Sequence, residues 1–163
     1  MPPTTLEFEA TITVQAPASR VLTAFVDPAD LARWWGVVRS VTVPRPLGTY
    51  AVVWNDKDFG DEILGKLGGA FHGTVMEYRP GQELFVAEAY WNPPEGEPIG
   101  PMSLQVRCTP VDTLQATQLT VRQSGDDEGP RWQRYFHVIG AGWQTALADL
   151  KRYLEDETSR GQR

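Results

Sequence analysis

The clearest hydrophobic pattern in the chain lies between residues 130 and 155. Apolar side chains recur there at steps of three and four residues, the spacing of one face of an α-helix; they are Trp132, Phe136, Ile139, Trp143, Leu147, Leu150 and Leu154. The pattern predicts a helix of about 26 residues, roughly 39 Å long, enough to cross a whole sheet. Gly140 and Gly142 interrupt it beside Phe136 and Trp143. Glycines inside a helix indicate a bend or the close approach of another group.

A second pattern, alternation of apolar and polar residues, begins at residues 6–14 and predicts a strand with one face in water. Further strand-like runs lie at residues 37–43, 47–54, 69–78, 84–91, 102–109 and 114–122, separated by turn-forming residues. Two short helices are expected after the first strand, at residues 19–26 and 29–34. Residues 55–68 are polar and rich in glycine, and predict a loop or a wide hairpin end. Residues 92–101, with four prolines and two glycines, predict a loop.

This order of elements predicts an α+β fold, with a curved antiparallel sheet of six or seven strands, two short helices after the first strand and a long C-terminal helix. The apolar face of the sheet has to be covered, and only the C-terminal helix is long enough to cover it. A curved sheet that grips one helix leaves a wedge between them, where we expect a ligand cavity. We expect a single domain over residues 1–163, ordered from about 6 to 156 with a tail at 157–163.

Charge and composition limit the classes of partner that the protein can bind. The net charge of −6 argues against nucleic acid and anionic membranes, which both need a basic surface. The chain has no apolar run long enough to span a membrane and no leader pattern, so we expect a cytoplasmic protein. Cys108 is the only cysteine, which excludes an internal disulfide. It alternates with Met102, Leu104 and Val106, which favours a small buried residue over a nucleophile. Two histidines without metal-ligand spacing predict no metal, and no motif indicates a cofactor.

Two titratable side chains in strands have orientations that the sequence leaves open. His72 points outward if Phe71 packs inward, and into the cavity if the register is reversed. Glu88 points outward if Ala87 and Ala89 lie on the core face. In the other register Glu88 would be a carboxyl in an aromatic cavity, with a raised pKa suited to general acid or base catalysis.

The chain also carries more large aromatic residues than a simple sheet-on-helix core needs. Either they fill that core, or several of them line a cavity for a ring-bearing or lipid-like molecule. The predicted lining is Trp35, Trp54, Trp91, Phe136 and Trp143, with Gly140 making room for the ligand and Tyr50, His72 or Glu88 as the polar group that orients it.

Three stretches of sequence carry a resemblance to a known superfamily. Residues 12–36 contain Ala-Pro, Asp-Pro and Trp-Trp in the order typical of its opening strand and two short helices. Residues 69–91 are similar to its G-x-F-x-G-x-V-x-E-x-x-P strand pair, and residues 142–154 to its terminal G-W-x-x-x-L-x-x-L-x-x-Y-L helix. The chain thus resembles the SRPBCC (START-like) superfamily, in particular the branch named after the activator of heat-shock-protein-90 ATPase. The resemblance implies the helix-grip fold.

The resemblance and the residues together leave three functions. The first is a non-catalytic carrier or sensor of a hydrophobic small molecule, which the aromatic residues favour. The second is a cavity enzyme of cyclase or hydrolase type that uses Glu88, His72 or Tyr50 as acid and base. The third, which the name of the branch implies, is a stress-response domain with a chaperone partner. We rank them in this order, with no catalytic residue assigned and a homodimer left open.

Overall fold

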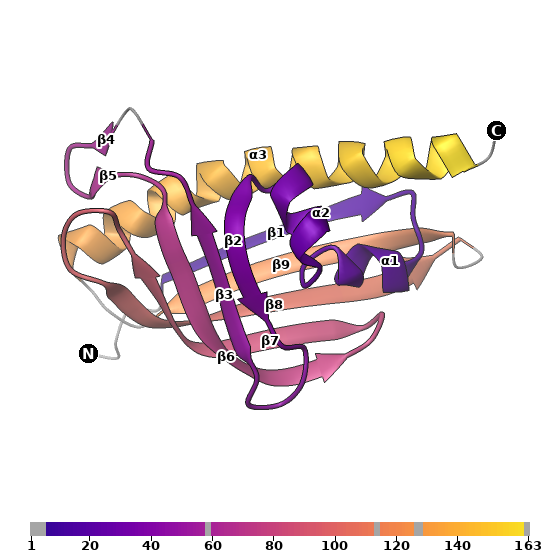
Figure 1. Ribbon diagram of the computed structural model, residues 1–163, viewed down its shortest axis with the longest axis horizontal. Coiled ribbons are helices and arrows are strands. Elements are labelled where there is room, and N and C mark those ends of the chain that lie inside the picture. Colours follow the sequence, from indigo (N-terminus) through magenta and orange to yellow (C-terminus); the bar gives the residue numbers. More distant parts are fainter. Residues whose placement is uncertain (1–5, 58–59, 113–114, 126–128, 162–163) are drawn as a thin grey trace.

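The computed structural model of the chain describes residues 6–57, 60–112, 115–125 and 129–161. They form a seven-stranded antiparallel sheet in the order β1-β9-β8-β7-β6-β3-β2, crossed by a long C-terminal helix (Figure 1). The predicted helix-grip α+β architecture is confirmed. The predicted chain end before residue 6 lies outside the described residues.

The elements follow the hydrophobic patterns of the sequence. The sheet contains β1 (Leu6–Val14), β2 (Val37–Thr42), β3 (Thr49–Trp54), β6 (Gly69–Arg79), β7 (Glu83–Asn92), β8 (Ile99–Val111) and β9 (Ala116–Gly125). The helices are α1 (Ala18–Thr23), α2 (Pro28–Trp34) and α3 (Pro130–Gly161), and a small separate ribbon consists of β4 (Gly60–Asp61) and β5 (Gly65–Lys66). The ribbon occupies the stretch predicted as a loop or a wide hairpin end, and Figure 1 shows it beside the first half of α3.

The helix α3 packs along the edge strand β1, where a glycine permits close contact. A Cβ atom at Gly140 would lie 3.3 Å from the ring of Phe8 on β1. Gly140 therefore makes room for a strand side chain, and that it also makes room for a ligand stays a prediction.

The strand β7 changes which of its residues face the core halfway along. Val86 is buried, as is Ala89 three residues later, and the pairing with β8 shifts register between them. Glu88 lies within this bulge with a positive φ of 50° and is exposed. A bulge inserts an extra residue and reverses the alternation beyond it. The outward alternative for Glu88 is what the structure shows, but Ala87 does not share the buried face with Ala89.

The C-terminal end of α3 is held against the two short helices by a network of charged groups. The Arg20 guanidinium donates to both oxygens of Asp30, at 2.7 and 2.8 Å, and also to Glu157 at 2.8 Å. The Tyr153 hydroxyl donates to Asp30 at 2.6 Å. The helix continues to Gly161, beyond the predicted end near residue 155, so residues 157–161 of the predicted tail are helical, and residues 162–163 lie outside the described residues.

Hydrogen bonding and charge determine the protonation of the buried Asp30 carboxyl in this network. The hydrogen bonds from Arg20 lower its pKa, against the effect of burial, and the bond from Tyr153 lowers it further. The folded structure therefore holds Asp30 as a carboxylate.

Within the described residues, no helix is both long enough and apolar enough to cross a membrane.

Candidate functional site

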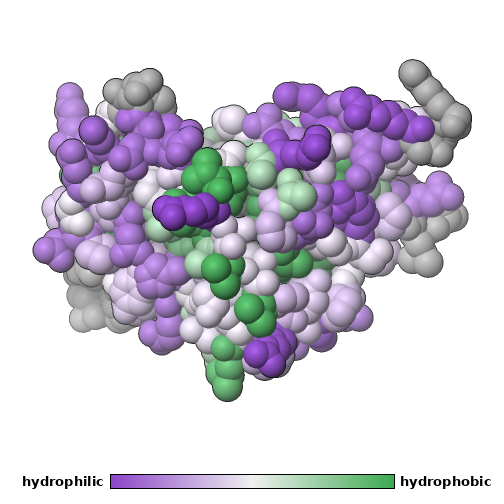
Figure 2. All heavy atoms as spheres, in the orientation of Figure 1, coloured by the Kyte–Doolittle hydropathy of each residue, from purple (hydrophilic) through white to green (hydrophobic). Residues whose placement is uncertain are grey.

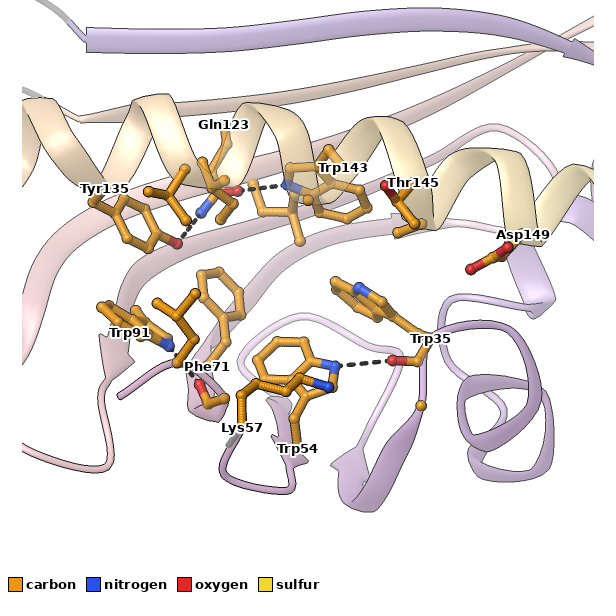
Figure 3. Close-up of a pocket in the computed structure, with 18 of the residues that line it drawn as sticks. Trp35, Trp54, Lys57, Phe71, Trp91, Gln123, Tyr135, Trp143, Thr145 and Asp149 are labelled. Carbon is orange, nitrogen blue, oxygen red and sulfur yellow. Dashed lines mark hydrogen bonds between the residues drawn. The ribbon is translucent and has the colours of Figure 1, made fainter. Parts of the chain in front are cut away.

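A cavity of about 610 Å³ lies between the sheet, α3 and the segment that carries the β4–β5 ribbon. Its wall is mainly aromatic and aliphatic, and Figure 3 shows Trp35, Trp54, Phe71 and Trp91 facing α3 across it. Residues from nearly every part of the chain contribute: Trp34, Trp35, Trp54, Leu64, Leu67, Phe71, Trp91, Leu104, Gln123, Tyr135, Val138, Ile139, Trp143 and Ala146. This volume is typical of small-molecule sites in proteins.

Three tryptophans form one continuous wall of the cavity. The ring of Trp35 lies 4.9 Å from that of Trp143 at 37°, and 5.1 Å from that of Trp54 at 76°. The Trp54 indole N–H donates to the Trp35 carbonyl at 3.1 Å. The Trp91 N–H donates to the carbonyl of Gly68 at 2.9 Å. Because these N–H groups are bound to the protein, the rings offer the cavity their apolar faces.

The end of α2 explains why two neighbouring tryptophans have different environments. Trp34 is the last residue of α2, and its N–H donates to the buried carbonyl of Ala24 at 2.8 Å. Trp35 caps the helix, and Gly36 then adopts a φ of 68°, in the region that favours glycine. The chain turns there into β2, so that Trp35 is half-buried at the cavity while its ring stacks on Trp34 at 4.9 Å.

One polar network lies inside this apolar wall. The Trp143 indole N–H donates to Oε1 of the Gln123 side chain at 2.8 Å. Nε2 of Gln123 is 2.9 Å from both the Tyr135 hydroxyl oxygen and the Met102 sulfur. Gln123 is 1% exposed and Tyr135 4%, so both groups are buried. Burial raises the pKa of the Tyr135 hydroxyl above its ordinary value, which keeps it a neutral phenol.

The mouth of the cavity is more polar than its interior. Its exposed lining residues include Arg33, Lys57 and Thr145, with Asp149 partly exposed beside them. Figure 3 shows Lys57 extending along Trp54. On the face seen in Figure 2, apolar side chains reach the surface between the β4–β5 ribbon and α2, with hydrophilic side chains around them.

An ion pair fastens the β4–β5 ribbon to α3 at the side of the cavity. The Arg134 Nε donates to the Asp61 carboxylate at 2.7 Å, and the backbone N–H groups of Ile63 and Leu64 donate to its other oxygen, each at 3.0 Å. The hydrogen bond from Arg134 lowers the pKa of Asp61 to about 2. This anchoring holds Leu64, 3% exposed, against the cavity.

The structure places four of the nine predicted lining residues on the cavity wall. These are Trp35, Trp54, Trp91 and Trp143. The other five lie elsewhere: Tyr50, His72, Glu88, Phe136 and Gly140. That the four contact a ligand stays a prediction.

The five remaining residues have identifiable positions. Tyr50 is fully buried behind the wall, and its hydroxyl donates to the Phe25 carbonyl at 2.8 Å. His72 and Glu88 are exposed, His72 beside the ring of Tyr90 at 5.9 Å. Phe136 is buried on another side of α3, where its ring packs against Trp132, 6.1 Å away, and Tyr135. Gly140 faces Phe8, as described above.

Several lining residues were not predicted, although the sequence carries signals for some. Tyr135, Ile139 and Ala146 share a helix face with Trp143 by their spacing of four, four and three residues. Gln123 continues the alternation of buried residues in β9, but the predicted strand ended one residue before it. The burial of Leu64 depends on the ribbon and its ion pair, for which no periodic signal exists.

The titratable and sulfur groups of the described residues give no sign of metal chemistry. No group of three or more histidine, cysteine, aspartate or glutamate side chains in these ranges is arranged to hold a metal ion. Cys108 is 6% exposed, and burial raises the pKa of its thiol to about 12. It is the small buried residue that its place in the alternating strand predicts.

Comparison with known proteins identifies the family. Residues 5–155 match the family described as "Polyketide cyclase / dehydrase and lipid transport". The chain belongs to this family. The match confirms the SRPBCC superfamily suggested by the sequence motifs. No curated protein matches the sequence significantly.

Solved structures with the same fold come from diverse bacteria. Protein Ms6760 from Mycobacterium smegmatis has a TM-score of 0.71 at 18% identity, covering 93% of this chain and 92% of that one. Protein CV1439 from Chromobacterium violaceum has a TM-score of 0.64 at 24% identity, covering 92% of this chain and 97% of that one. The Aha1 dimer from Colwellia psychrerythraea has a TM-score of 0.61 at 16% identity, covering 91% of this chain and 96% of that one. At these identities the likeness shows the fold alone, and the chaperone partner, stress response and homodimer stay predictions.

Proposed function

We propose that this protein is a carrier or sensor that binds a hydrophobic, ring-bearing small molecule in the cavity between the sheet and α3. The observation that carries the proposal is the wall formed by Trp35, Trp54 and Trp143, in which the Trp35 ring lies about 5 Å from each of the other two, at a cavity of about 610 Å³. Aromatic faces bind flat or polycyclic molecules through stacking and the burial of apolar area. The family description, which includes lipid transport and polyketide chemistry, supports the same class of ligand.

The alternative of an acid–base enzyme depended on Glu88, His72 and Tyr50, and none of these residues lines the cavity. Such an enzyme needs at least two titratable groups within hydrogen-bond reach of one substrate in the cavity. His72 and Glu88 are exposed and do not line the cavity, and the Tyr50 hydroxyl is occupied behind its wall. Binding without turnover is the function that the described side chains support best.

Intrinsic tryptophan fluorescence tests the proposal. The protein is titrated with flavonoids, fatty acids, sterols and polycyclic aromatic ketones, and each ligand is recovered afterwards for mass analysis. We expect a saturable quench by at least one class, with the ligand recovered unchanged. Trp143→Ala should weaken that binding by more than tenfold, because it removes one face of the wall.

The matched control is Trp132→Phe. Trp132 is buried on α3 beside Gly125, does not line the cavity and should leave the affinity unchanged. Recovery of a chemically altered ligand would mean that the protein is an enzyme and not a carrier. Failure of every class to bind a folded protein would contradict the proposal.

A further inference from the structure

Trp143 determines the orientation of the Gln123 side-chain amide, which is buried in the cavity wall. An indole N–H can only donate a hydrogen bond. Because the Trp143 N–H points at the Gln123 side chain from 2.8 Å, the atom that it meets has to be the oxygen Oε1. A flipped amide would place two donors against each other in a buried position, which is strongly unfavourable.

The fixed amide in turn determines the role of the Tyr135 hydroxyl. With Oε1 turned to Trp143, the amide nitrogen of Gln123 lies 2.9 Å from the Tyr135 oxygen and donates to it. The oxygen of Tyr135 is thus an acceptor in this contact, and its own hydrogen is not used there. Among the described residues, no group accepts a hydrogen bond from this hydroxyl.

The hydroxyl of Tyr135 borders the cavity. Tyr135 lines it, and Figure 3 shows the hydroxyl turned toward the space between α3 and the side chains of Phe71 and Trp91. The indole N–H of Trp91 is directed elsewhere, to the Gly68 carbonyl. The residue is 4% exposed, so its hydroxyl is a donor removed from bulk water.

We infer that the Tyr135 hydroxyl donates a hydrogen bond to an oxygen acceptor of the ligand, so that the preferred ligands are ring systems carrying a carbonyl group. The inference rests on the proposed function and specifies its ligand class. A buried donor with no partner disfavours a ligand that offers only hydrocarbon at that position and favours one with an acceptor there. Gln123 is a positioning residue, and Trp143, besides forming part of the wall, also acts as one, since both determine the hydrogen bonding of the Tyr135 hydroxyl.

The test uses two probes with the same tricyclic framework, fluorenone and fluorene, which differ by a carbonyl in place of a methylene group. Dissociation constants are measured by tryptophan quenching for the wild type, Tyr135→Phe and, as a control, Tyr90→Phe, which does not line the cavity. We expect the preference of the wild type for fluorenone over fluorene to fall about fivefold in Tyr135→Phe and to stay unchanged in Tyr90→Phe.

A spectroscopic readout makes the test independent of how well the variant folds. The carbonyl stretching band of fluorenone bound to the wild type should lie below its frequency in a hydrocarbon solvent, as a hydrogen-bonded carbonyl does. In Trp143→Phe the Gln123 amide loses the donor that orients it, so it is free to flip and accept, through Oε1, a hydrogen bond from the Tyr135 hydroxyl. The preference for fluorenone should therefore fall in this variant too, although Tyr135 is present.

The outcomes separate the two proposals. Equal preference for fluorenone in wild type and Tyr135→Phe, or an unshifted carbonyl band, would overturn the donor role while leaving a hydrophobic binding site intact. Binding of neither probe by the folded wild type would overturn the inferred ligand class, whereas the proposed function is overturned only if every class of the wider ligand panel also fails to bind. A shifted band together with the loss of preference in Tyr135→Phe supports the assignment.

Discussion

The indole N–H of Trp54 donates to the backbone carbonyl of Trp35 at 3.1 Å, and the two rings meet edge to face with centroids 5.1 Å apart. This contact joins the end of β3 to the residue that caps α2. Two segments that lie apart in the sequence thereby become one wall of the cavity. The position of Trp35 depends on this bond as well as on its packing against Trp143.

Trp54→Phe tests the bond between these segments. The substitution keeps an aromatic ring and removes the N–H donor, so the free energy of unfolding should fall by about 1 kcal/mol. Affinity for an aromatic ligand should weaken about threefold or more, because the Trp35 ring is less firmly held. Urea denaturation and fluorescence titration measure the two effects. Unchanged values in both would show that the bond does not organise the wall.

The Asp30 carboxylate should be a main determinant of stability. Its side chain is 6% exposed and binds Arg20 through both oxygens. Removing one partner of a buried ion pair leaves the other charge uncompensated, so Asp30→Ala should destabilise the protein by about 3 kcal/mol. The control is Glu7→Ala, which removes a more exposed pair with Arg122 and should cost less than about 1 kcal/mol. Equal losses in urea denaturation would refute the role of the buried pair.

The same carboxylate predicts how stability changes with pH. Hydrogen bonds from Arg20 lower the pKa of Asp30 in the folded protein, so the unfolded chain binds its proton more tightly. The resulting stability is fully present above the ordinary carboxyl pKa of about 3.9 and is lost as the pH falls through the lower folded-state value. Urea midpoints between about pH 5 and pH 2.5 should therefore fall less steeply for Asp30→Asn than for the wild type. Parallel curves would exclude Asp30 as a source of the pH dependence.

Two glycines on α3 should respond differently to the same substitution. At Gly142 an added Cβ meets nothing within 4 Å, so Gly142→Ala should stabilise the helix by about 1 kcal/mol. At Gly140 the Cβ would lie 3.3 Å from the Phe8 ring, which has to shift. Gly140→Ala should therefore be less favourable than Gly142→Ala by at least about 0.5 kcal/mol in urea denaturation. An equal gain at both positions would mean that the contact with Phe8 is loose.

Most of the fold follows from the sequence because periodicity reports which face of an element is buried. The α3 stripe from Trp132 to Leu154 and the alternation in β1 each predict their element correctly. The bulge beside Glu88 was not predicted, since a reversal of alternation depends on the pairing of β7 with β8. The helix beyond residue 155 was not predicted either, and its contact there, from Glu157 to Arg20, joins residues far apart in the sequence.

The candidate site was predictable only in part. Size and aromatic character indicate Trp35, Trp54 and Trp143, but not which side of α3 each aromatic residue faces, so Phe136 was included and Tyr135 was not. The role of Gln123 depends on three side chains from different elements, and no spacing in the sequence records such a contact. Polar groups inside a cavity are thus less evident from sequence than its apolar wall.

The indole N–H resonances of the six tryptophans test the central claim most directly, since each reports one position in the structure. A ¹⁵N-labelled sample is titrated with a ligand that quenches the tryptophan fluorescence saturably, and the indole region is recorded at each step. We predict saturable shifts for Trp35, Trp54 and Trp143, which line the cavity, and an unmoved signal for Trp132, which does not. Shifts that are absent, or that are as large for Trp132 as for the other three, would contradict a ligand-binding cavity between the sheet and α3.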